Sequence, residues 1–201
     1  MKGTNSWTLW STVIVVATTL GIPAAHANAQ TQSPVGFGVF AGGSLPVGDF
    51  GDVGGTGWHA GALIDWRSPL FPVGIRGDLA YHQFGSKDTG FIAGGGVTFT
   101  PKLVVGTLNL VWSFPVSAES AVSPYIIGGG GFYNERGSCT NCNNAPIVSE
   151  TKFGLNGGAG VMVSLSGFGS LIEARYHLIF DSDATTSNSS FITLSAGIIF
   201  R

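Results

Sequence analysis

Charged side chains are scarce in this 201-residue chain. Asp, Glu, Lys and Arg make up 10% of it, whereas soluble domains average roughly 25%, which disfavours an ordinary cytoplasmic globule. Basic residues are not in excess, since nine Lys and Arg stand against eleven Asp and Glu. The positive field that nucleic-acid binding requires is therefore missing. Two cysteines are too few for a disulfide-stapled scaffold.

Long hydrophobic runs suited to a membrane helix are also lacking. The nearest candidate, Phe153–Ile172, is uncharged but contains six glycines, one asparagine and three serines. Even so, 44% of the chain is hydrophobic, and its 32 glycines favour extended structure. Apolar surface that belongs to no helix predicts strands with one face toward lipid. Such a sheet must close into a barrel, because lipid cannot hydrogen-bond an open edge.

The first residues have the pattern of an export signal. Lys2 supplies a positive start, and the apolar run Val13–Leu20 is too short to span a bilayer. Small residues at 25 and 27, and again at 27 and 29, form two cleavage patterns. We therefore expect residues 1–27 to be a secretory signal peptide, with a cut after 29 as the alternative. Residues 28–201 then form one domain.

Alternation of apolar and polar residues predicts eight strands of about nine to twelve residues. They are Pro34–Gly43, Trp58–Trp66, Val73–Gly85, Lys102–Phe114, Tyr125–Tyr133, Lys152–Leu165, Ser170–Phe180 and Phe191–Arg201. Segment Gly90–Pro101 is a strand extension or a loop, so ten strands is the structural alternative. Four consecutive glycines, Gly128–Gly131, leave the register of the fifth strand open.

The connections between these strands predict an orientation. Those after odd-numbered strands, such as Ser44–Gly57 and Asn134–Thr151, are long, and those after even-numbered strands are short. Membrane barrels have long extracellular loops and short periplasmic turns. We therefore expect both termini on the periplasmic side.

Charged residues alternate with the apolar stripe and should face the lumen. An eight-stranded interior is only wide enough for side chains to fill, so we expect a buried ion-pair network in which each carboxylate has a guanidinium partner. A rearranging Arg–Glu pair that gates small ions is the functional alternative. The expected members are Asp65, Arg76, Asp78, Glu173 and Arg175.

Three histidines, His59, His82 and His177, are expected to form a second tier toward the extracellular end of the lumen. No element carries them at a metal-ligand spacing, so the sequence favours a structural role over a metal site. No cofactor is implied.

The pair Cys139 and Cys142 lies in the third long loop. A redox motif normally starts a helix, and a zinc site needs a second pair of ligands. The sequence offers neither, so we predict a disulfide that stiffens an exposed loop in an oxidising envelope.

Several motifs resemble a known family. They are Gly43–Phe50 in the first loop, the Pro124-Tyr125 start of a glycine-rich strand, Glu173–His177, and the aromatic Phe200 near the end of the last strand. The chain is similar to the small eight-stranded outer-membrane β-barrel proteins of OmpA/OmpX type, and more closely to the outer membrane protein beta-barrel domain group. Arg201, which follows Phe200, departs from the family's terminal aromatic.

The resemblance implies an all-β, closed, antiparallel, up-and-down transmembrane barrel in the outer membrane of a Gram-negative-type bacterium. It also implies outer-membrane lipid, periplasmic chaperones and the barrel-insertion machinery as partners, with Phe200 as the assembly signal for that machinery. We expect a structural or surface-interaction role, at most a narrow pore, and an extracellular ligand bound through the loops.

Two other functions remain as alternatives. Some small barrels modify lipid A or phospholipids, but no hydroxyl lies two residues beyond His177, because Leu178, Ile179 and Phe180 follow it. A secreted lipocalin-like lipid carrier would also have eight strands. It would be expected to carry charged outer faces, which are nearly absent here.

Overall fold

The computed structural model describes residues 33–68, 71–92, 95–117, 120–140, 149–165, 168–181 and 188–201. The expected signal peptide lies outside these residues, so its boundaries stay predictions. The described elements are β1 (Val35–Val47), α1 (Asp49–Val53), β2 (Gly55–Arg67), β3 (Val73–Gly85), β4 (Lys87–Ile92), β5 (Gly95–Ser113), β6 (Val122–Thr140), β7 (Ser149–Leu165), β8 (Phe168–Ile179) and β9 (Ser189–Phe200). Within these ranges no helix has the length and apolar character needed to cross a membrane.

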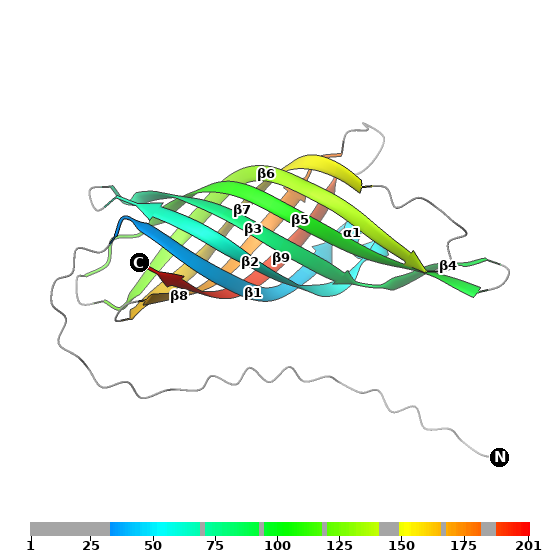
Figure 1. Cartoon of the computed structure of the whole chain (residues 1–201), viewed down its shortest axis with the longest axis horizontal. Coiled ribbons are helices and arrows are strands. Elements are labelled where there is room, and N and C mark those ends of the chain that lie inside the picture. Colours follow the sequence, from blue (N-terminus) through cyan, green and yellow to red (C-terminus); the bar gives the residue numbers. More distant parts are fainter. Residues whose placement is uncertain are drawn as a thin grey trace, which may run out of the picture. The chain divides into compact units, whose positions relative to one another are not determined.

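Eight of the strands close into an antiparallel barrel (Figure 1). The order runs β3-β2-β1-β9-β8-β7-β6-β5, and β5 pairs again with β3. First and last strands meet, with Ala41 of β1 opposite Ala196 of β9. The predicted all-β closed barrel is therefore confirmed.

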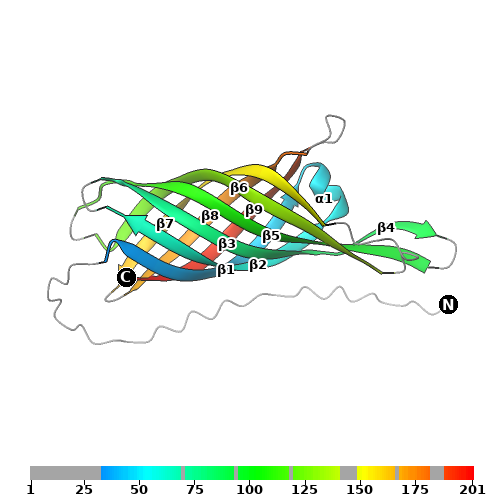
Figure 2. The same cartoon turned by 45° about the horizontal axis from the view of Figure 1, so that its top comes forward.

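The ten-stranded alternative is wrong. The segment Gly95–Pro101 extends β5, and β4 pairs with this extension, where Lys87 lies opposite Phe99. In the described part of the chain β4 has no other partner strand. The β4–β5 hairpin therefore projects beyond the barrel wall instead of adding strands to it (Figures 1 and 2).

The two ends of the barrel differ. Figures 1 and 2 show the start of β1 and the C-terminus at one end, and α1 and the β4–β5 hairpin at the other. We call the first the terminal end and the second the loop end. The loop end is the side of the long connections.

Several strands are longer than their sequence pattern indicated. Val73–Gly85 has the predicted bounds, but Ser44–Val47, expected in a loop, belongs to β1 and is followed by helix α1. The expected loop Asn134–Thr151 likewise contains the last seven residues of β6 and the first three of β7. The extensions of β6 and β7 carry polar residues on both faces, so they lack the apolar alternation that reveals a strand. Ser44–Val47 contains Pro46, a residue that normally argues against a strand interior.

Outside and inside faces of the barrel have opposite chemistry. Large apolar side chains point outward, with Leu108 and Phe132 each 65% exposed. Trp66 and Trp112 lie outward near the terminal end and Trp58 lies outward toward the loop end, as in the aromatic girdles of membrane barrels. The wall therefore presents an apolar belt to lipid.

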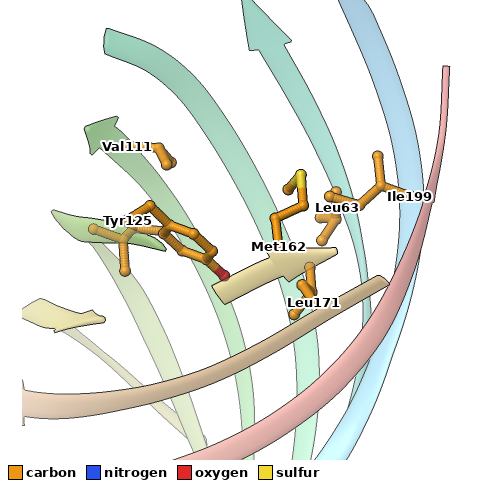
Figure 3. Close-up of a cluster of buried hydrophobic side chains, with 7 residues drawn as sticks. Leu63, Val111, Tyr125, Met162, Leu171 and Ile199 are labelled. Carbon is orange, nitrogen blue, oxygen red and sulfur yellow. The ribbon is translucent and has the colours of Figure 1, made fainter. Parts of the chain in front are cut away.

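The lumen holds two apolar clusters with a polar layer between them. The terminal cluster contains Leu63, Val111, Tyr125, Ile127, Met162, Leu171 and Ile199, and Figure 3 shows these side chains converging inside the strands. The loop cluster contains Phe84, Leu103, Val105, Tyr133, Ile179 and Phe191, with Phe50 of α1 packed on it. One apolar cluster thus lies toward each end of the barrel.

The glycines of β6 mark a close approach between strands. A Cβ on Gly129 would lie 2.1 Å from the backbone oxygen of Leu108, while one on Gly106 of β5 would meet no atom within 4 Å. Gly129 faces the lumen opposite Asn109. The register that the sequence left open is thus one in which only glycine fits at position 129.

We predict that Gly129→Ala destabilises the barrel by about 1–3 kcal/mol, because the added methyl overlaps backbone that cannot move aside. Urea unfolding of the detergent-folded barrel, followed by the difference in gel mobility between boiled and unboiled samples, would measure it. Gly106→Ala is the matched control and should leave the midpoint nearly unchanged. Equal midpoints for the two variants would contradict the packing explanation.

Candidate functional site

Four charged side chains cross the middle of the lumen. Arg76 and Asp78 point inward from β3, and Glu173 and Arg175 point inward from β8. Arg76 Nη1 lies 2.9 Å from Glu173 Oε2, and Arg175 Nη1 lies 2.8 Å from Asp78 Oδ2. Arg175 Nε also pairs with Glu173 Oε1. The structure thus joins two strands that are not neighbours in the barrel wall.

Neutral groups complete this network. Tyr125 donates a hydrogen bond of 2.8 Å to Glu173 Oε2, and the Arg76 guanidinium lies 5.3 Å from the centre of the Tyr125 ring. Asn109 donates to Asp78 Oδ2 over 2.8 Å, and Asn156 donates to Asn109 Oδ1 over 2.8 Å. Tyr125, Asn109 and Asn156 are additions to the network members expected from the sequence.

The fifth charged residue, Asp65, lies nearer the terminal end and forms its own cluster. Its Oδ2 accepts a bond of 2.8 Å from Arg67 Nε and a second bond from Arg201. Arg76 Nε is 3.6 Å from its Oδ1, which links the two clusters. Arg67 and Arg201 are additions to the residues expected from the sequence.

Arg201 reaches Asp65 across strand β1. Arg201 follows β9, Asp65 lies on β2, and Gly36 of β1 lies between them, where a Cβ would stand 2.9 Å from Arg201 Cγ. The ion pair therefore spans the seam at which the first and last strands meet. Phe200 points outward and is 56% exposed, so its proposed part in assembly stays a prediction.

Three buried histidines form the next layer toward the loop end. Ser44 Oγ lies 3.1 Å from Nδ1 of both His59 and His82, and His59 Nε2 lies 2.8 Å from Ser195 Oγ. The rings of His59 and His82 stack with centroids 5.0 Å apart. Because one hydroxyl donates a single proton, Ser44 donates to one imidazole and accepts from the other.

His177 belongs to the same layer but has different partners. The Tyr133 hydroxyl lies 3.0 Å from its Nδ1, and its ring stacks on Phe191 at 4.5 Å between centroids. Hydroxyl groups thus form hydrogen bonds with the imidazole nitrogens that would otherwise coordinate a metal. Among the described residues no three His, Cys, Asp or Glu side chains are arranged to hold a metal ion.

A small cavity lies between the ion-pair network and the histidine layer. Its volume is about 20 Å³, and Asp78, Arg175, His59 and His82 are among the residues that line it. This is room for about one water molecule. The cavity is therefore too small for a lipid or a hydrated ion.

Helix α1 covers the lumen at the loop end. Gly48 precedes it with a φ of 60°, which a side chain would disfavour, and this turn directs Phe50 onto the loop cluster. The Phe50 ring packs edge-on against Phe84 at 4.9 Å and against Phe191 at 6.5 Å between centroids. The sequence pattern predicts a loop over Ser44–Gly57 and gives no sign of helix α1.

Lys152 gathers three carboxylates at the rim of the loop end. Its Nζ lies 2.8 Å from Asp181, 3.1 Å from Glu135 and 3.5 Å from Glu150. Lys152 lies one residue beyond the outward-facing Phe153 and hence beyond the apolar belt. Burial alone would lower the pKa of its ammonium, but the bonds to Asp181 and Glu135 outweigh burial and raise the pKa above its ordinary value.

The expected disulfide falls partly outside the described residues. Cys139 lies in β6 with its backbone opposite Phe99 of β5. Cys142 lies outside the described ranges, so the pairing stays a prediction.

Comparisons with known proteins agree on one architecture. The model of the outer membrane protein beta-barrel domain family matches residues 12–200. Neisserial surface protein A is 18% identical over 84% of this chain and 97% of its own, with a TM-score of 0.57. A major outer membrane protein from Thermus thermophilus is 16% identical over 83% of this chain and 98% of its own, with a TM-score of 0.56. No curated protein matches.

We predict that Glu173→Gln destabilises the barrel by about 3–5 kcal/mol, because it leaves Arg76 and Arg175 buried with one carboxylate fewer between them. Equilibrium unfolding in urea would measure the loss. Glu150→Gln is the control, since that side chain is 48% exposed and should change stability by less than about 0.5 kcal/mol. A Glu173 variant as stable as the control would show that the network is dispensable.

Proposed function

Because the chain belongs to the outer membrane protein beta-barrel domain family, we propose that it is a sealed outer-membrane barrel with a structural or surface-interaction role carried by its loop end. The single observation that carries this proposal is the filled lumen. Apolar clusters close both ends, and charged and histidine layers occupy the middle. Interiors of this width are expected to hold side chains and not solutes.

The loop end supplies the surface for interaction. Strands β5, β6 and β7 continue past the apolar belt, and the β4–β5 hairpin extends from the same end (Figure 2). Long connections on rigid strands are where binding residues are commonly placed. Under the orientation rule for membrane barrels, this end faces the outside of the cell.

The contents of the lumen also bear on the enzyme alternative. The Ser44, His59 and His82 side chains resemble a nucleophile and base in type, but all three are buried inside the barrel beneath the loop cluster. A binding or structural role therefore suits the geometry better than acyl transfer or lipid hydrolysis.

The secreted lipid carrier does not fit. Family membership places the chain in the outer membrane, and the outward belt is apolar, with Phe37 and Leu79 each 61% exposed. A carrier would also need an internal cavity of lipid size. The volume between the polar layers is about 20 Å³.

Assembly and loop chemistry belong to the same proposal. Phe200 is the outward aromatic near the end of β9 that the barrel-insertion machinery and periplasmic chaperones would meet. A disulfide between Cys139 and Cys142 would stiffen the connection between β6 and β7, where an extracellular ligand would bind.

Planar-bilayer recording with the purified barrel tests the sealed lumen. We expect no conductance above the bilayer background, because an apolar cluster lies on each side of the charged and histidine layers. Boiled and unboiled gel mobility would verify that the inserted protein is folded. Steady ohmic current through the folded wild-type protein would overturn the proposal.

Glu173→Ala, recorded in the same way, distinguishes a fixed seal from a gate. A gate built on the Arg76–Glu173 pair requires a change in conductance when the carboxylate is removed. We expect the folded variant to stay as silent as the wild type, since the apolar clusters at both ends remain. Open channels in this variant alone would support the gate and contradict a fixed seal.

A further inference from the structure

Two cations lie opposite each other on the outer surface near the loop end. Lys102 of β5 and Arg136 of β6 are register partners, and both belong to the outward-facing set of their strands. Directly opposed residues on one face of an antiparallel pair have Cβ atoms about 4.5–5.5 Å apart, and like charges in this position repel. Nothing in the barrel wall requires this arrangement.

The acidic groups at the height of Lys102 and Arg136 face the inside of the barrel. Glu135, Glu150 and Asp181 surround Lys152 at the inner rim. Neither Lys102 nor Arg136 forms an ion pair with any residue whose side chain the structure describes. Positive charge is thus presented outward and negative charge is kept inward, which favours a partner for the two cations from outside the barrel.

The height of the pair corresponds to lipid headgroups. Lys102 lies two residues beyond Val104, and Arg136 lies four residues beyond Phe132, which are the nearest outward apolar residues on each strand. With a rise of about 3.3 Å per residue and a strand tilt of about 40°, these steps correspond to heights of about 5 and 10 Å above the belt. The headgroup layer is about 5–7 Å deep on each side of a bilayer. Lys102 therefore starts within this layer, and Arg136 starts about 3 Å above it, from where a long basic side chain can reach back to it.

Hydrogen bonds orient the arginine. Arg136 Nε donates to Asn134 Oδ1 over 2.8 Å, and Asn134 Nδ2 donates to Thr151 Oγ1 over 2.8 Å and to Ser149 Oγ over 3.1 Å. This chain of bonds holds the guanidinium through its Nε, while the Arg136 side chain as a whole stays exposed. A guanidinium fork beside an ammonium suits the oxygens of a phosphate group.

We propose that Lys102 and Arg136 bind the phosphate of a lipid headgroup in the leaflet at the loop end, with the outward apolar residues below them contacting the acyl chains of the same lipid. In an outer membrane the corresponding lipid is a phosphorylated glycolipid. The site lies outside the lumen, so it is independent of whether the lumen is sealed.

Fluorescent lipid A, titrated against the detergent-folded full barrel at low ionic strength, tests the site by anisotropy. Each single change, Lys102→Gln or Arg136→Gln, should weaken binding roughly fivefold, since one basic residue near an anionic lipid contributes about that factor. The double variant should lose most of the binding. The charge-preserving double variant, Lys102→Arg with Arg136→Lys, should bind nearly as the wild type does.

Lys87→Gln is the matched control, because it removes one positive charge from β4, outside the β5–β6 pair. It should leave the affinity within about twofold. Loss of binding equal to that of Lys102→Gln would show that net charge alone attracts the lipid and would overturn the site. Gel mobility of each variant would confirm that it is folded.

Competition with unlabelled ligands identifies which part of the lipid the site recognises. Unlabelled bis-phosphorylated lipid A should displace the probe, whereas dephosphorylated lipid A and inorganic phosphate at equal concentration should not. Displacement by dephosphorylated lipid A would place recognition in the acyl chains, and displacement by inorganic phosphate would show a free-anion site. Either result would overturn a lipid-phosphate site.

Discussion

Backbone hydrogen bonding in a medium without water is the constraint from which the structure follows. Each strand in the lipid layer must find partners on both edges, so the sheet has to return from β9 to β1. Closure with eight strands then fixes a narrow interior. The outward residues are apolar because they meet acyl chains, and the inward residues are free to be polar provided that they satisfy one another.

Many of the buried polar groups meet this second requirement, in layers, although Asp78 Oδ1 and Arg76 Nη2 have no hydrogen-bond partner among the described residues. Charged groups lie between apolar clusters. Tyr125 and Asn109 add hydrogen bonds to the same carboxylate oxygens that the arginines contact, Glu173 Oε2 and Asp78 Oδ2. Closer to the loop end the histidines are bonded to hydroxyls and stacked on aromatic rings. Such an arrangement depends on geometry across the lumen, because strands β3 and β8 contribute opposite sides of the same network.

The predictability of these features differs along each strand. Alternation located β3 to the residue and placed Glu173 and Arg175 inward, because lipid enforces the period of two there. The outer part of β6 does not show this pattern, because a strand in water carries polar residues on both faces. Ser44–Val47 is predicted as a loop because it contains Pro46 and is flanked by Gly43 and Gly48. The sequence also does not predict which ionic groups pair with each other. Alternation shows that Asp65 faces inward. Its contact with Arg201 depends on the stagger between strands and on the absence of a side chain at Gly36.

The bond between Arg201 and Asp65 has a consequence for the order of folding. Its partners are 136 positions apart in the chain, and they adjoin only when β9 has docked on β1. Closing so long a segment is entropically slow compared with zipping neighbouring hairpins. The Arg201 guanidinium therefore bonds Asp65 at the final step, when β9 pairs with β1 and closes the barrel. The hairpins between neighbouring strands have formed by then. Separation of β9 from β1 must break the ion pair between Arg201 and Asp65.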